Sequence, residues 1–140
     1  MGGTSARGTH ASGATGTMSE AEWNRIININ LTGPWLVTEA VLPTMKEKKS
    51  GSIMFVSSMG AVQPVVPVLH YHSAKAGVIG LSLNLAFELA PIGIRVNTIL
   101  PGPTMNTLLF DYLTSAQPEV RDNMESDVPL NRLACPEDMA

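Results

Sequence analysis

The sequence Ser58–Lys75, SMGAVQPVVPVLHYHSAK, follows a short apolar run at Ser52–Val56 and leads into a long apolar segment. Tyr71 and Lys75 lie four residues apart, which on a helix places both side chains on one face, one turn apart. A phenol has an ordinary pKa of about 10, and a neighbouring ammonium group lowers that pKa. We therefore predict that Lys75 lowers the pKa of Tyr71. With a serine at the end of the preceding strand, the pair forms a proton-transfer site for an alcohol or carbonyl oxygen.

The apolar run before this stretch predicts a strand. Ile53–Val56 is short, apolar and partly β-branched, which is typical of a strand buried in a parallel sheet. Ser57 and Ser58 follow directly, at the carboxyl end of that strand, where ligand sites of open α/β sheets gather. The apolar loop Gln63–Leu69 contains two prolines and is not regular helix. It either packs in the core or forms a wall of a substrate pocket.

A long helix and a second strand complete the unit. We expect helix from about His70–His72 to Glu88 or Ala90, apolar around much of its circumference. We expect such a helix to be buried on two sides, one of which packs on the sheet, while the other could meet a partner subunit. Its main apolar stripe consists of Val78, Leu81, Leu85 and Leu89. Ile94–Leu100 predicts the second strand, and two strands joined by a helix form a right-handed βαβ unit with a parallel sheet.

A second helical region precedes the first strand. Ser19 and Glu22 have the spacing of a capping box, in which each side chain bonds the backbone amide of the other residue. Helix is expected to follow through Leu31 and to be interrupted at Gly33–Pro34. It then continues or restarts over Trp35–Lys48.

These segments together resemble the short-chain dehydrogenase/reductase family, in an order and spacing that agree from about Ser19 to the C-terminus. The matching pieces are Ile29–Pro34, Ile53–Ser58, Tyr71–Gly77, Gly93–Ile99 and Leu100–Pro103. The resemblance implies a partial Rossmann-like α/β fold, a doubly wound parallel sheet with a βαβ core and long helices. It also implies an NAD(P)-dependent oxidoreductase that transfers hydride between nicotinamide and an alcohol or carbonyl substrate.

The resemblance also implies a role for each of four residues. Tyr71 is the general acid or base for the alcohol or carbonyl oxygen, and Lys75 lowers its pKa and binds the nicotinamide ribose. Ser58, thirteen residues before Tyr71, bonds the same substrate oxygen, while Ser57 is only its neighbour. Asn30 distorts its helix and helps to relay the proton through a water molecule. On its sequence position alone, Asn30 is instead a buried amide with its hydrogen bonds satisfied.

Cofactor contacts beyond Tyr71 and Lys75 are implied for the turn after the second strand. Pro101 and Gly102 would lie over the nicotinamide, and the residue matching Thr104 meets the carboxamide. Asn106 stands where the family usually has threonine, with Thr107 next to it. Either could bond the cofactor. Residues 107–127 occupy the place of the family's substrate lid and are predicted to contain one or two helical pieces.

Composition limits the remaining alternatives. The chain has 140 residues, 44% of them hydrophobic and 15% charged, which suits one modest globular domain. A net charge of −3 and a single basic cluster at Lys46–Lys49 argue against nucleic acid. Cys135 is alone, the sequence shows no basic-then-apolar leader, and we expect a soluble cytoplasmic protein. No histidine has the carboxylate or cysteine spacing of a zinc site, so no metal is expected.

The domain organisation is expected to be incomplete. Residues 1–18 read as a flexible loop, and 19–140 as a partial domain truncated at both ends. The sequence contains no G-x-G-x-x-G turn for a pyrophosphate, so we expect a fragment whose choice between NAD and NADP stays open. The resemblance implies a homo-oligomer, dimer or tetramer, formed through the two long helices. The alternative is a non-catalytic chain that acts as a dimerisation or interaction module.

Overall fold

A computed structural model describes residues 15–64, 66–105, 107, 110, 114, 115 and 119–139. These residues form two compact units, one ending at Leu100 and the other beginning at Pro101, and each is described by itself. Most of the predicted flexible loop, residues 1–14, lies outside the described part, and so does Asn106.

The first unit opens with an unbroken helical run. Helix α1 (Glu20–Ile27) continues through a π-helical segment (Asn28–Thr32) into α2 (Gly33–Lys48). Gly33 keeps helical angles (φ −57°, ψ −53°), and its amide donates to the carbonyl oxygen of Asn28, so the helical run continues into Pro34 in the first turn of α2. The predicted interruption at Gly33–Pro34 is therefore wrong. The irregularity is the π-helical segment, which begins five residues earlier.

Ser19 caps α1 as expected. Its hydroxyl oxygen accepts a hydrogen bond from the Glu22 backbone amide (3.2 Å). The carboxylate of Glu22 does not complete the capping box in the expected way, because both of its oxygens accept from Arg25 (3.1 and 2.8 Å).

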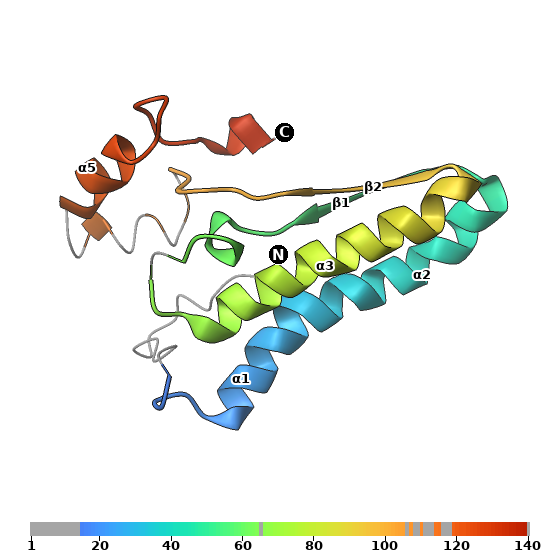
Figure 1. The fold of residues 1–140 in the computed structure, drawn as a ribbon, viewed down its shortest axis with the longest axis horizontal. Coiled ribbons are helices and arrows are strands. Elements are labelled where there is room, and N and C mark those ends of the chain that lie inside the picture. The colour runs from blue at the N-terminus through green and yellow to red at the C-terminus, as the bar shows by residue number, and fades with distance from the viewer. Residues whose placement is uncertain are drawn as a thin grey trace. The chain divides into compact units, whose positions relative to one another are not determined.

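The predicted βαβ unit is confirmed. Strands β1 (Gly51–Val56) and β2 (Ile94–Ile99) pair in parallel, with Gly51 opposite Ile94 and Val56 opposite Ile99. Helix α3 (Leu69–Leu89) connects them and covers one face of the sheet, while α2 runs beside α3 (Figure 1). An ion pair between Lys46 and Glu88 (3.9 Å) links the two helices near their C-terminal ends.

Gly93 fixes the entry into β2. Its φ of +80° lies in the left-handed region, and a Cβ atom at this position would lie 2.7 Å from the carbonyl oxygen of Lys49. Lys49 itself ends α2 in the left-handed conformation (φ +48°). The turns before the two strands therefore pack directly against each other.

The core lies between α3 and the sheet. The predicted stripe is confirmed, because Val78, Leu85 and Leu89 are buried and Leu81 packs against them. The other members of this core are Leu42, Phe55, Ile94 and Val96. By length and composition the Leu69–Ile92 segment could also cross a membrane, but this buried stripe is typical of the core helix of a globular domain.

Two apolar surfaces of the first unit remain exposed. Met54 and Val56, on the sheet face opposite α3, are 58% and 53% exposed. Leu83 and Phe87, one turn apart on α3, are 66% and 88% exposed. Within this chain α3 is therefore buried on one of the two predicted sides.

The second unit contains α5 (Glu119–Ser126) and a 3-10 helix (Pro136–Met139). The helical piece predicted within residues 107–127 is present as α5. An isolated parallel bridge pairs Thr104 with Ala134.

Candidate functional site

The two adjacent serines that follow the end of β1 have different roles. Ser57 is buried, its N–H donates to the carbonyl oxygen of Ile99 (2.9 Å), and its hydroxyl donates to that of Lys75 (2.8 Å). Ser57 thus ties the strand end to β2 and α3. Ser58 is half-buried, and its hydroxyl oxygen accepts from the Gly60 amide (3.2 Å), which starts the 3-10 turn Met59–Ala61. Of the two hydroxyls, Ser58 is the one available to a substrate.

Tyr71 and Lys75 lie on one face of α3, as their spacing predicts. The Lys75 ammonium nitrogen is 5.6 Å from the centre of the Tyr71 ring. Lys75 is 7% exposed, and its Nζ donates to the carbonyl oxygen of Val56, the last residue of β1 (2.9 Å). This bond holds a buried cation at the carboxyl end of the strand.

The pKa values of the pair differ from the prediction. Burial raises the pKa of Tyr71 above its ordinary value, and the Ser58 hydroxyl opposes that shift. Burial also lowers the pKa of the Lys75 ammonium group. The predicted lowering of the Tyr71 pKa by Lys75 is therefore wrong for this structure, because burial of the phenol raises that pKa and the opposing effect comes from Ser58. At neutral pH Tyr71 keeps its proton and can donate it.

Asn30 lies in the π-helical segment and is 1% exposed. Its Nδ2 donates to the carbonyl oxygen of Ile26 (3.1 Å), but its Oδ1 is buried without a partner in the described part of the chain. The interpretation of Asn30 as a fully satisfied amide is therefore wrong. A buried oxygen of this kind is commonly bonded to an ordered water molecule.

Leu31 brings the π-helical segment against α3. A Cβ atom on Gly77 would lie 2.8 Å from Leu31 Cδ2, so the two elements touch two residues beyond Lys75. The Asn30 segment and the Lys75 segment are thus packed neighbours.

Two histidines beside Tyr71 have a structural importance that the sequence did not indicate. His70 is buried, and its Nδ1 accepts from the Tyr71 N–H (2.8 Å). The His72 ring packs on Gly60, where a Cβ atom would lie 2.5 Å from its Nε2. A glycine two residues after Ser58 was the available signal, because only glycine leaves room for that ring.

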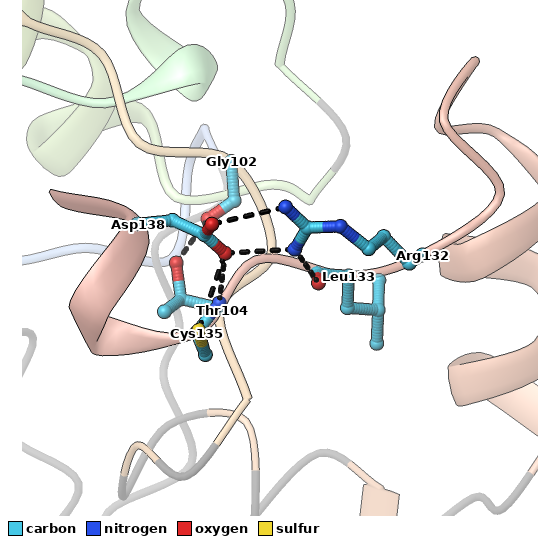
Figure 2. A network of polar contacts seen from close by, with 6 residues as sticks. All are labelled: Gly102, Thr104, Arg132, Leu133, Cys135 and Asp138. Carbon is cyan, nitrogen blue, oxygen red and sulfur yellow. Dashed lines mark hydrogen bonds and ion pairs between the residues drawn. The ribbon is translucent and has the colours of Figure 1, made fainter.

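The second unit holds the predicted cofactor turn. The Thr104 hydroxyl donates to the carbonyl oxygen of Gly102 (3.1 Å), and the Thr107 hydroxyl donates to that of Thr104 (3.0 Å). Figure 2 shows Gly102 and Thr104 beside the side chains of Arg132 and Asp138. The Thr104 hydroxyl uses its proton in the hydrogen bond to Gly102. The lone pairs of the hydroxyl oxygen remain able to accept a hydrogen bond from another group. Pro101 and Gly102 are half-buried at the start of this turn.

Each unit, taken by itself, offers groups of the kind that bind the nicotinamide half of a dinucleotide. Lys75 has three N–H groups, and its one described bond, to Val56, leaves two for hydroxyl oxygens of a ribose. The Thr104 oxygen can accept from a carboxamide.

Comparisons with known proteins agree with this fold. The family model described as short chain dehydrogenase matches residues 5–118. Dehydrogenase/reductase SDR family member 4 of Sus scrofa is 35% identical over 122 residues, which are 87% of this chain and 43% of the relative. The 3-oxoacyl-(acyl-carrier-protein) reductase of Thermotoga maritima is 38% identical over 124 residues, 88% of this chain and 48% of the relative. The chain therefore spans less than half the length of these two relatives.

A solved structure shares the same arrangement of helices and strands. A protein from Beutenbergia cavernae, described as an NAD(P)-dependent gluconate 5-dehydrogenase with bound NADP, superposes with a TM-score of 0.85 at 30% identity. The match covers 90% of this chain and 50% of that one. With a family match over most of its sequence and this agreement in fold, the chain belongs to the short-chain dehydrogenase family of oxidoreductases.

Proposed function

We propose that the chain carries the reacting half of an NAD(P)-dependent oxidoreductase that interconverts an alcohol and a carbonyl compound. The observation that carries this proposal is the placement of Tyr71 and Lys75 on one face of α3, at the strand end that also presents Ser58. A half-buried phenol beside a buried ammonium group indicates a functional site, because each group loses hydration and has its pKa shifted.

Tyr71 acts as the proton donor to the carbonyl oxygen in the reducing direction. Its raised pKa keeps the phenol protonated at neutral pH. Ser58 donates a hydrogen bond to the same oxygen and stabilises the negative charge that develops on it. The proton from Tyr71 ends on the product hydroxyl, and in the oxidising direction it returns to the phenolate.

Lys75 binds the ribose hydroxyls of the nicotinamide with the N–H groups that Val56 leaves free. The cofactor, when bound, supplies or accepts the hydride at C4 of its nicotinamide ring. The Thr104 oxygen accepts from the carboxamide, and Pro101 and Gly102 form the turn that carries it. The bound cofactor is NAD or NADP.

Asn30 supports a path for protons between the site and solvent. Its unpartnered Oδ1 is the acceptor that a buried water needs, and the Leu31–Gly77 contact sets this segment beside α3. Such a water would resupply the proton that leaves through Tyr71.

The pyrophosphate and adenosine half of the cofactor is held by residues outside this sequence. Support comes from the absence of a G-x-G-x-x-G turn in this sequence and from matches that cover 43% and 48% of two relatives. We therefore expect this chain alone to bind the cofactor weakly, through its nicotinamide half.

A homo-oligomer is proposed through the outer faces of α2 and α3. Leu83 and Phe87 on α3 are exposed, as are Leu36 and Val37 on α2, at 54% and 66%. Exposed apolar side chains on adjacent helices favour contact with another subunit. The same surface supports the second candidate function, a dimerisation module without catalysis.

Deuterium transfer separates the two functions. The 140-residue chain is incubated with several millimolar NADH or NADPH, deuterated at C4, and a panel of small ketones and aldehydes. The proposal expects deuterium at the former carbonyl carbon of a product alcohol, detected by mass spectrometry, and none with Tyr71→Phe. Absence of deuterated alcohol, together with concentration-dependent association in sedimentation, would favour the dimerisation module.

A further inference from the structure

One carboxylate organises the C-terminal part of the second unit. Asp138 accepts from both terminal nitrogens of Arg132 (2.8 and 3.0 Å). It also accepts from the backbone amide and the thiol of Cys135 (2.8 and 3.3 Å), as Figure 2 shows. Paired bonds between a guanidinium and a carboxylate are strong and directional, and a charged acceptor strengthens the bond from the amide.

The bonds between the side chains of Arg132 and Asp138 join the two ends of this segment, so that residues 132–138 form a closed ring. Arg132 Nη1 also donates to the carbonyl oxygen of Leu133 (3.3 Å), and the Asp138 amide donates to that of Cys135 (3.0 Å). Leu133 is 1% exposed, which anchors the ring to the interior. Ala134, between Leu133 and Cys135 in the sequence, is one of the backbone members of this ring.

Ala134 connects the ring to the predicted cofactor turn, which is the segment that contains Gly102 and Thr104. The Met105 amide donates to the carbonyl oxygen of Ala134 (2.8 Å), and the Ala134 amide donates to that of Pro103 (3.3 Å). The two bonds flank Thr104 and together make up the isolated parallel bridge between Thr104 and Ala134. Thr104 is thus held on both sides by one residue of the ring.

We propose that Asp138 is a positioning residue for the cofactor turn, which acts through Ala134 to hold the Thr104 hydroxyl in its orientation. This inference rests on the proposed contact between Thr104 and the nicotinamide carboxamide. Asp138 itself touches neither cofactor nor substrate. The ligand whose binding would depend on Asp138 in this way is a nicotinamide nucleotide.

An isolated surface ion pair would not do this, because such pairs usually stabilise a fold very little. Asp138 differs because its carboxylate also accepts a hydrogen bond from the backbone amide of Cys135, the residue next to Ala134. The Arg132 guanidinium and that amide hold the pKa of Asp138 below its ordinary value. The stabilisation is therefore present at neutral pH and is lost only as the pH falls through that lowered pKa.

Amide hydrogen exchange on the 140-residue chain tests the first half of this proposal. We expect Asp138→Asn to speed exchange of the Met105 and Ala134 amides about tenfold, since a bond to a charged acceptor is replaced by a neutral one. Asp138→Ala, which removes the acceptor as well, should speed it further. The matched control is Asp127→Asn, the same chemical change at an exposed residue of this unit, which should change these rates less than twofold. Equal rates in Asp138→Asn and the parent chain would overturn the proposal.

Cofactor affinity tests the second half. The dissociation constant of NADH or NADPH should rise about tenfold in Asp138→Asn and stay unchanged in Asp127→Asn. Faster exchange with unchanged affinity would overturn the positioning role and leave the proposal for Tyr71 and Lys75 intact. If the parent chain binds no cofactor, the proposed function of the chain fails, while the exchange rates still decide whether Asp138 holds the Thr104 turn.

Discussion

Tyr71→Phe should lower kcat by about a thousandfold in any form of the protein that turns over. The substitution removes the phenol proposed to donate the proton beside Ser58, and general acid catalysis typically contributes 10²–10⁴-fold. The ring and its packing remain, so cofactor affinity should change less than about threefold. Initial rates followed at 340 nm, with cofactor binding measured separately, check both numbers. The pH profile gives a second reading, because reduction by the parent slows as the pH rises through the raised pKa of Tyr71.

The two adjacent serines supply a matched control for that experiment. Ser58→Ala should lower kcat because it removes a donor to the substrate oxygen. Ser57→Ala removes the bond to the Lys75 carbonyl oxygen and should cost stability more than catalysis. Parental turnover in Tyr71→Phe would show that another group moves the proton.

Leu89→Ala should lower the free energy of unfolding by about 2–5 kcal/mol, the range for leucine truncation in a packed core. Leu89 has no exposed surface and lies where α3 meets the sheet. Small domains are stable by only about 5–15 kcal/mol, so this one substitution should remove a large part of the total. Urea unfolding followed by circular dichroism at 222 nm gives the value.

Phe87→Ala is the control, two residues away on the same helix. Phe87 is 88% exposed, so its truncation should change the stability of the dilute chain by less than about 0.5 kcal/mol. Equal losses in the two variants would contradict the assignment of the buried and exposed faces of α3.

The sequence was sufficient to predict the βαβ unit, because its signals are local. The apolar run before Ser57, the stripe from Val78 to Leu89 and the second strand each follow from periodicity. The choice of Ser58 over Ser57 came from the family resemblance, in which the catalytic serine stands thirteen residues before the tyrosine, and the hydrogen bonds of Ser57 agree with it.

The π-helical segment could not be predicted in the same way. Gly33–Pro34 is a strong local breaker signal, but proline fits the first turn of α2. The added residue instead falls at Asn28–Thr32, where Leu31 packs on Gly77, a contact between residues 46 positions apart. Such a contact leaves no trace in local periodicity.

The electrostatics of the site depend equally on tertiary structure. Spacing places Lys75 beside Tyr71, but it does not reveal that Nζ bonds the Val56 carbonyl oxygen or that burial controls the phenol. The ring closed by Asp138 shows the same limit. No local pattern predicts this ring, in which Asp138 accepts hydrogen bonds from four donors.

The measurement that tests the central claim most directly is a cofactor titration of the 140-residue chain and its Lys75→Met variant. Binding of NADH and NADPH is followed through the fluorescence of Trp23 and Trp35. We expect saturable binding with a dissociation constant of about 1 mM, or about −4.1 kcal/mol, and at least tenfold weaker binding in Lys75→Met. Equal affinity in the two chains, or no saturable binding by the parent up to about 10 mM, would contradict the claim that this chain carries the nicotinamide side of the site.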